Sequence, residues 1–234
     1  MGFIEKVNAM RRFFYLLLFL CISMNSYSQD AINWEKVVVR DSTGNVYPTA
    51  VWQRLAQTGR YQIQVGADRV SGTIRYLNDN DLPKPDPSKF FTTGQKMRPF
   101  SVTDINGNKF TLAELTGKVV VLNFWFINCG PCRQEIPRLN EIVNNYANNK
   151  DIVFIALALD QKAELVSFLS GFPFTYHIVD NCGYLAQQNG VGLFPTHVII
   201  DKKGNVLFHT SGLSISTIPW LRKSIEAALA GKVI

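Results

Sequence analysis

The sequence predicts an α/β protein: a sheet covered by helices, preceded by a smaller unit. Over residues 97–234, segments with the pattern of strands alternate with segments that have the pattern of helices. Residues 119–126 (VVVLNFWF) form a near-continuous apolar run, as expected for a strand buried on both faces. Apolar residues make up 47% of the 234 residues and charged residues 18%, an ordinary balance for a globular protein.

Residues 29–77 are expected to form a small α+β unit of unknown role, too short to bury much core alone. Its predicted strands are residues 35–40, 61–65 and 73–77. Residues 49–58 are predicted to form a helix, with Thr49 as N-cap and Gly59 as its end. Residues 78–96 contain three prolines spaced by polar residues, which predicts an extended linker.

The larger domain, residues 97–234, begins with a hairpin that turns at Asn106-Gly107-Asn108. Its predicted elements are strands 100–102, 109–111, 119–126, 152–159, 175–179, 196–200 and 206–209, and helices 131–146, 162–169, 184–189 and 214–230. Strands that alternate with helices imply a mostly parallel sheet covered on both faces.

The first 28 residues have the pattern of a secretory signal peptide. Two arginines precede ten uncharged residues, 13–22, and small residues stand before an expected cleavage after Ser28. The mature chain would then start at Gln29 in the periplasm, an oxidising compartment. An uncleaved membrane anchor is the alternative. A lipoprotein anchor on Cys21 is disfavoured, because the residue before it is not small.

The distribution of charge argues against nucleic-acid binding. The net charge is +6 at pH 7, and the lysines and arginines beyond the leader are scattered without a run or stripe. A metal site is not expected either, because His177, His197 and His209 have no pairing at metal-ligand spacing. No cofactor is predicted beyond a redox-active pair of cysteines.

The strongest chemical signal is Cys129-Gly130-Pro131-Cys132, between a predicted strand and a predicted helix. A cysteine in the first turn faces the unpaired N–H groups and the positive end of the helix dipole, which lowers its pKa. The two-residue spacer places Cys132 beside Cys129 but deeper. We therefore expect thiol–disulfide exchange in which Cys129 attacks and Cys132 resolves. A structural disulfide or half of a metal site is the alternative interpretation.

Residues 97–234 resemble the TlpA/ResA-like family of exported thioredoxin-fold thiol-disulfide oxidoreductases, which is related to the AhpC/TSA redoxin group. The resemblance lies in VVVLNFWFINCGPCRQEIPRLN, in Phe194-Pro195-Thr196, in the early hairpin and in an extra helix and strand over 162–179. It implies a thioredoxin-like fold with a central mixed sheet. It also implies a disulfide-containing protein substrate and a membrane thiol donor that re-reduces the pair, in some members during cytochrome c maturation.

The resemblance also implies roles for residues outside the two cysteines. Pro195 matches the family's cis-proline, beside which the backbone of Phe194 would pair with an extended substrate segment. Gly130 and Pro131 are expected to complete this substrate-binding surface. Asn128 departs from the family, which usually has Trp directly before the first cysteine. The expected aromatic side chain beside the thiol is therefore missing, and the sequence does not define the substrate-binding surface.

A proton acceptor for Cys132 is expected at Glu135. Asn123 stands six residues before Cys129, where cytosolic thioredoxins carry a buried acid, and an amide cannot act as a base. In the TlpA/ResA-like family an acid after the CXXC motif is thought to serve instead, and Glu135 matches it. Glu135 lies one helical turn after Cys132, so the two side chains share a face. An ordinary exposed helix residue is the alternative.

Cys182 follows the predicted strand 175–179. If this strand runs in the same direction as strand 119–126, Cys182 lies at the same edge of the sheet as Cys129. A possible accessory thiol is one interpretation, and a lone buried small apolar residue is the other.

Three functions remain open from the sequence. A reductase is favoured, because Gly130-Pro131 adds no charge that would stabilise a thiolate, as in reducing thioredoxin. A peroxiredoxin-like peroxidase with an antioxidant role would need Thr or Ser three residues before the reactive cysteine, where Phe126 stands. A non-enzymatic binding module or metallochaperone would not need both the CGPC motif and Pro195.

Overall fold

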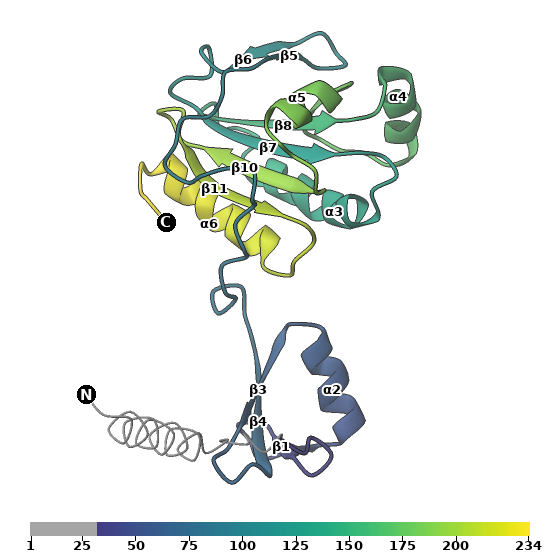
Figure 1. The fold of residues 1–234 in the computed structure, drawn as a ribbon, viewed down its shortest axis with the longest axis vertical. Coiled ribbons are helices and arrows are strands. Elements are labelled where there is room, and N and C mark those ends of the chain that lie inside the picture. The colour runs from purple at the N-terminus through teal and green to yellow at the C-terminus, as the bar shows by residue number, and fades with distance from the viewer. Residues whose placement is uncertain (1–31) are drawn as a thin grey trace, which may run out of the picture. The chain divides into compact units, whose positions relative to one another are not determined.

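The computed structural model describes residues 32–234 (Figure 1). The predicted signal peptide, its cleavage site at Ser28 and Cys21 therefore lie outside the described residues. The described chain divides into two compact units. One contains the residues up to Arg54 together with Ile63–Arg75, and the other contains Leu55–Gln62 and Tyr76–Ile234.

The N-terminal elements form a four-stranded sheet in the order β2-β1-β4-β3, with one helix. Their bounds are β1 Val38–Arg40, β2 Val46–Tyr47, α2 Thr49–Gln57, β3 Tyr61–Val65 and β4 Ser71–Tyr76. Strand β1 pairs antiparallel with β2 and parallel with β4. The predicted strands and helix are present, and the two-residue β2 is an addition to them. The core here is small: Trp52 of α2 is buried and contacts Trp34 in a tilted arrangement, with 5.9 Å between ring centroids.

The second unit contains a five-stranded sheet in the order β11-β10-β7-β8-β9 and a two-stranded hairpin, β5-β6. The bounds are β5 Ser101–Thr103, β6 Lys109–Thr111, β7 Val119–Trp125, α3 Gly130–Asn145, β8 Ile152–Ala158, α4 Lys162–Gly171, β9 His177–Val179, α5 Gly183–Gln188, β10 Thr196–Ile200, β11 Val206–Ser211 and α6 Thr217–Leu229. Every element predicted over this stretch is present, with ends displaced by three residues at most.

The sheet is mixed, as the family resemblance implied, rather than mostly parallel, as the alternation of elements suggested. Strands β7, β8 and β9 are parallel, whereas β10 is antiparallel to both β7 and β11. The tight turn over 201–205 joins β10 directly to β11 without a crossover helix, which makes these two strands antiparallel.

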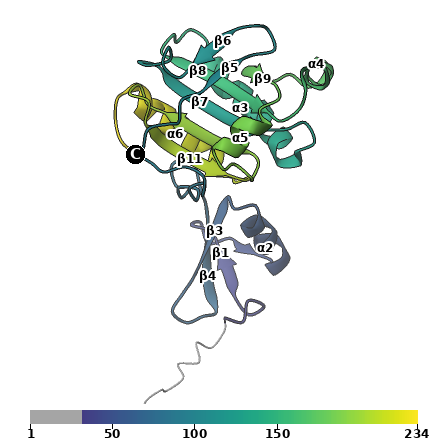
Figure 2. The same ribbon diagram turned by 45° about the horizontal axis from the view of Figure 1, so that its top comes forward.

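The two faces of this sheet carry separate cores, because side chains alternate along each strand. One core packs beneath α3 and α6 and includes Val121 and Trp125 of β7 (Figures 1 and 2). The other packs beneath α5 and the segment around the hairpin, and includes Leu122 and Phe124 of the same strand. Strand β7 is buried along its whole length, as its apolar run predicted.

Residues 78–96 lie against the second unit and are not a free linker. Leu82 is only 2% exposed, and its carbonyl accepts a hydrogen bond from Trp220 Nε1–H of α6 at 3.0 Å. Thr210 Oγ1 of β11 donates to the carbonyl of Asp86 at 2.9 Å. Gly94 N–H donates to the carbonyl of Val206 at 2.8 Å. We call residues 78–96 the strap; it is extended, as its prolines predicted, but docked.

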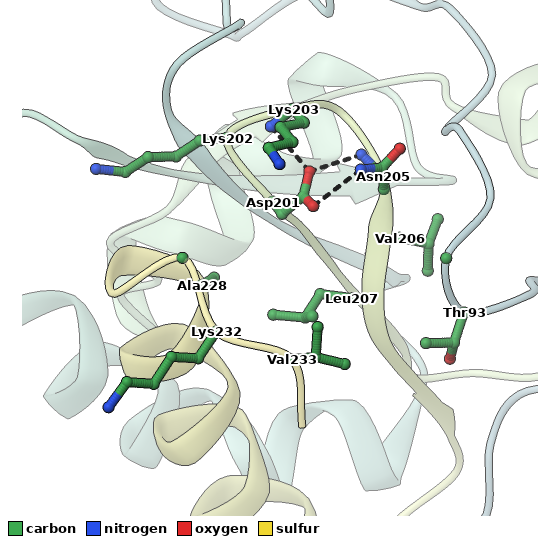
Figure 3. Close-up of a pocket in the computed structure, with 12 residues that line it drawn as sticks. Thr93, Asp201, Lys202, Lys203, Asn205, Val206, Leu207, Ala228, Lys232 and Val233 are labelled. Carbon is green, nitrogen blue, oxygen red and sulfur yellow. Dashed lines mark hydrogen bonds between the residues drawn. The ribbon is translucent and has the colours of Figure 1, made fainter.

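A cavity of about 290 Å³ opens between the turn over 201–205, β11 and the end of α6 (Figure 3). None of the site residues predicted from the sequence lines it. Within residues 32–234, no helix is both long enough and apolar enough to cross a membrane.

Candidate active site

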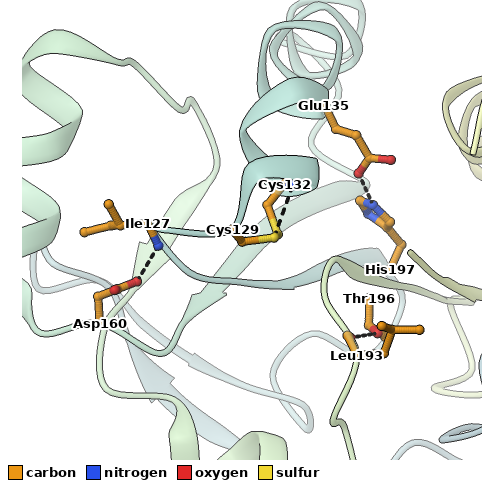
Figure 4. Close-up of a disulfide and its surroundings, with 8 residues drawn as sticks. All are labelled: Ile127, Cys129, Cys132, Glu135, Asp160, Leu193, Thr196 and His197. Atoms are coloured by element: carbon orange, nitrogen blue, oxygen red, sulfur yellow. Dashed lines mark hydrogen bonds and ion pairs between the residues drawn. A yellow bond between two sulfur atoms is a disulfide. The ribbon is translucent and has the colours of Figure 1, made fainter. Parts of the chain in front are cut away.

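Cys129 and Cys132 form a disulfide at the junction between β7 and α3, with 5.3 Å between their Cα atoms (Figure 4). The local sequence explains this placement. The buried strand β7 ends at Trp125, and Pro131 stands in the first turn of α3, where its missing N–H costs no hydrogen bond. Cys129 is the N-cap residue, and its Sγ accepts the backbone N–H of Cys132 at 3.2 Å. The sulfur of Cys129 therefore lies at the positive end of the helix.

The two cysteines differ in depth in the direction that the spacing predicts. Cys129 is 4% exposed and Cys132 is 1% exposed. The difference is small, and both residues pack within the core beneath α3.

The loop that precedes the disulfide is held by a carboxylate that the sequence analysis missed. Asp160 Oδ2 accepts the backbone N–H of Ile127 at 2.8 Å (Figure 4). Leu159, just after β8, donates its N–H to the carbonyl of Trp125 at 3.1 Å. The end of β8 thus fixes the path of the chain into the CGPC motif. The sequence signal that could have identified Asp160 is an acidic residue directly after a buried strand.

The Phe194–Pro195 peptide bond is cis, as the family resemblance implied. Thr196 Oγ1 donates to the carbonyl of Leu193 at 2.6 Å, which holds the loop around this bond. The ring of Phe194 packs edge-on against Phe126 at 5.4 Å, so the cis-proline loop contacts the loop that leads to the cysteines.

Glu135 is buried and paired. It is 3% exposed, and its Oε2 lies 2.8 Å from Nε2 of His197, which is fully buried (Figure 4). The interpretation of Glu135 as an ordinary exposed helix residue is therefore wrong. The sequence alone does not link His197 to Glu135, because 62 residues separate them. The available signal was a polar residue within the apolar run 196–200 (THVII).

More buried polar groups gather around this pair. Asn123 of β7 is the cross-strand partner of His197 in β10, so the two side chains share the face covered by α3. Tyr176 is also buried on this face. Burial, with a smaller contribution from the negative charge of Glu135, raises the pKa of Tyr176 well above its ordinary value, so its hydroxyl stays neutral.

Cys182 lies at the predicted edge of the sheet but not in the disulfide's core. Strands β7, β8 and β9 are parallel. Cys182, which comes after β9, therefore lies at the same edge of the sheet as Cys129, which comes after β7. Its side chain, however, packs in the core of the opposite face, with Phe100 and Ala186. It is a free thiol, and burial, with the charge of Asp180, raises its pKa to about 12. The structure does not bring it together with the CGPC pair.

Over residues 32–234, no group of three or more His, Cys, Asp or Glu side chains is arranged to hold a metal ion. The described site contains a disulfide pair at a helix N-terminus, a cis-proline loop beside it, and a buried carboxylate–imidazole pair one helical turn deeper.

The chain is similar in sequence and fold to known proteins. Thiol-disulfide oxidoreductase ResA of Bacillus thuringiensis subsp. konkukian is 34% identical over 131 residues, which cover 53% of this chain and 75% of the relative. The thioredoxin-like protein YneN of Bacillus subtilis is 35% identical over 114 residues, 47% of this chain and 66% of the relative. A solved structure described as the thiol:disulfide interchange protein DsbE from Chlorobium tepidum superposes with a TM-score of 0.54 at 31% identity, covering 59% of this chain and 99% of its own.

The fold and the site together define a thioredoxin-fold protein with a CXXC disulfide centre. The Redoxin family model matches residues 92–229, more than half of the chain. The chain belongs to this family, among its ResA/TlpA-like members.

Proposed function

We propose that this thiol-disulfide oxidoreductase works as a reductase of protein disulfides, with Cys129 as the attacking thiol and Cys132 as the resolving thiol. The observation that carries the proposal is the position of the Cys129–Cys132 disulfide at the N-terminus of α3, with Cys129 as the N-cap residue. A thiolate at Cys129 is stabilised there by the helix dipole and by the N–H of Cys132, which already donates to its sulfur.

The reaction starts from the reduced pair. The Cys129 thiolate attacks one sulfur of the substrate disulfide, a Cys129–substrate bond forms, and the substrate's first thiolate leaves. Cys132 then loses its proton and attacks Cys129. The Cys129–Cys132 bond forms, the bond to the substrate breaks, and the second substrate thiolate leaves. Two electrons have passed from the protein to the substrate.

The two residues between the cysteines indicate the direction of the reaction. Gly130 and Pro131 carry no charge or side-chain donor that would stabilise the thiolate further. Thioredoxin, with a thiol pKa near 7, has a potential of about −270 mV, whereas the far more acidic thiol of DsbA accompanies about −120 mV. We therefore expect a couple closer to thioredoxin.

A reductase outside the cytoplasm needs a source of electrons. The predicted signal peptide supports export to the periplasm, where a membrane thiol donor would re-reduce Cys129 and Cys132. Cytochrome c maturation or redox homeostasis of the cell envelope would be suitable roles. Cell fractionation and sequencing of the native N-terminus, expected at Gln29, test the location.

The potential of the Cys129–Cys132 couple is the measurement that tests the proposal. The protein is equilibrated with a series of dithiol/disulfide buffers, and its oxidised fraction is measured by thiol alkylation and mass spectrometry. A potential near about −270 mV, together with reduction of a model protein disulfide, is the expected result. A potential near about −120 mV would make the protein an oxidase instead.

A further inference from the structure

The Glu135–His197 pair is built differently from an ordinary buried ion pair. Only one hydrogen bond joins the two groups, from Nε2 to Oε2 at 2.8 Å. Among the described residues, Glu135 Oε1 and His197 Nδ1 have no hydrogen-bond partner, and neither atom is exposed. Oε1 is therefore a hydrogen-bond acceptor that the protein leaves unused, on a buried carboxylate whose other oxygen is held by His197.

The surroundings of the pair contain few other charges. On the same face of α3, Cys132 lies one turn before Glu135. Tyr176, from the segment before β9, faces the pair as a neutral hydroxyl. Strand β7 contributes the uncharged amide of Asn123. The residues that α4 and α6 bury in this core are apolar or carry only a hydroxyl group. His197 is therefore the basic group that contacts Glu135.

A lone carboxylate is costly to bury, and a carboxylate beside an imidazolium is much less so, because the pair is neutral as a whole. We propose that His197 is a positioning residue for thiol–disulfide exchange. It holds Oε2 of Glu135 and supplies the positive charge that keeps the buried carboxylate ionised. Oε1 is thereby left as the acceptor for the proton of Cys132. This inference rests on the proposed function.

The proton movement fits the resolving step. In the mixed disulfide, the Cys132 thiol gives its proton to Oε1 of Glu135, and the resulting thiolate attacks Cys129. The departing substrate thiolate takes up a proton, and Glu135 returns its own to solvent. During this transfer Glu135 becomes neutral while His197 stays positive, so the new thiolate forms beside a net positive pair.

Asn123 is a further buried polar residue beside the pair, on the neighbouring strand. Its Oδ1 is a buried acceptor without a partner, and its residue is directly paired with His197 across β7 and β10. The unpaired donor position, Nδ1 of His197, and the unpaired acceptor thus lie on cross-strand neighbours.

The kinetic test compares His197→Gln with His209→Gln. His209 is the matched control, because it is also buried but packs on the opposite face of the sheet, where Thr93 Oγ1 lies 3.3 Å from its Nε2. Stopped-flow reduction of a model disulfide separates attack by Cys129 from resolution by Cys132. In His197→Gln, we expect resolution about 10-fold slower at pH 7, a pH profile displaced upward so that the rate recovers toward pH 9, and an unchanged attack rate.

Two further comparisons make the test specific. In a Glu135→Gln background, adding His197→Gln should change the resolution rate less than 2-fold, because the acceptor is already gone. If His197→Gln slows attack and resolution equally, or resembles His209→Gln, the histidine is only a packing residue and the proposal is overturned. If the wild-type protein reduces no disulfide at any pH, the proposed function itself fails, whatever the variants do.

A measurement on the wild-type chain covers the case in which His197→Gln does not fold. The ¹⁵N shifts of the histidine side chains report the charge of each ring in the oxidised and reduced protein. We expect His197 to carry a proton on both ring nitrogens at pH 6–7 in the oxidised state. A neutral His197 ring at pH 6–7 in both redox states would overturn the proposal.

Discussion

At the scale of single residues, the site separates two similar thiols by their position on one helix. Cys129 caps α3 and meets the N–H groups of its first turn, whereas Cys132 lies inside that turn and is more deeply buried. The same chemical group therefore lies at the N–H groups of the helix end in one position and inside the first turn in the other.

Replacing each cysteine by serine should show this division of labour. Cys132→Ser should accumulate mixed disulfides through Cys129, because nothing remains to resolve them, and Cys129→Ser should accumulate few and lose reductase activity. Non-reducing electrophoresis after incubation with a model substrate measures both. Equal trapping by the two variants would show that the assignment of the nucleophile is wrong.

Cys182 should neither react with alkylating reagents nor contribute to disulfide reduction. Because burial raises its pKa to about 12, its thiol stays protonated at pH 8, where the reactive form is the thiolate. Iodoacetamide at pH 8 should label Cys129 in the reduced native protein and leave Cys182 unmodified, as read by peptide mass spectrometry. Cys182→Ser should change the rate of disulfide reduction less than about 2-fold. Rapid labelling of Cys182 in the folded protein would revive the accessory-thiol interpretation.

At the scale of elements, a buried carboxylate helps to attach the hairpin β5-β6 to the sheet. Asp104 Oδ1 accepts the N–H groups of Asn106 and Asn108 within the turn. Its Oδ2 lies 2.8 Å from Nδ1 of His177 in β9. Burial opposes the charge of Asp104, but the hydrogen bonds, led by those from Asn108 and His177, outweigh it and lower its pKa below the ordinary value of 3.8.

The lowered pKa fixes the sign of a stability prediction. A group whose pKa is lowered by folding stabilises the protein above its unfolded pKa, and this contribution is lost as the pH falls through the folded value. Asp104→Asn should therefore lower the free energy of unfolding by about 1–3 kcal/mol at pH 7, and by less below pH 4. Urea unfolding at several pH values measures this difference.

The matched control for this variant is Asp151→Asn. Asp151 also accepts a hydrogen bond from a basic partner, Lys202 at 2.8 Å, but it is exposed. Exposed ion pairs contribute little to the free energy of unfolding, so the urea midpoint of this variant should barely change. Equal losses in the two variants would mean that the position of Asp104 beneath the hairpin has no special effect.

At the scale of the whole molecule, the strap joins the second unit rather than separating two units. Its contacts with α6 and β11 bury Leu82 and use the polar groups of Trp220 and Thr210. The segment before residue 97 is therefore part of what stabilises the thioredoxin-like fold around the disulfide.

Two shortened chains test this role of the strap. A chain that starts at residue 76 keeps the strap, whereas one that starts at residue 97 loses it and exposes the surface that Leu82 covers. We expect the second to melt about 5–10 °C lower than the first, from the loss of a few kcal/mol of apolar burial. Calorimetry on the two oxidised proteins measures the difference. Equal melting temperatures would show that the strap is only a connection.

Much of this molecule was predictable because its signals are local. The strand β7, the helix α3 and the CGPC motif between them are contiguous, and the capping of a helix by the residue before it depends only on neighbours in the chain. The position of Glu135 relative to Cys132 follows from helical spacing alone. For the same reason the ends of the strands and helices of the second unit agree with the predicted ones to within three residues.

The tertiary structure alone decided the partners of these residues. His197 meets Glu135, and Asp160 meets Ile127, because β10 and β8 are the two neighbours of β7 in the sheet. Periodicity shows that a strand is buried but not which strand pairs with it or in which direction, since every apolar strand offers the same backbone hydrogen bonds. The sequence by itself determined the thiol pair and the elements that present it. Only the packing of distant strands decided that a buried histidine lies beside its carboxylate.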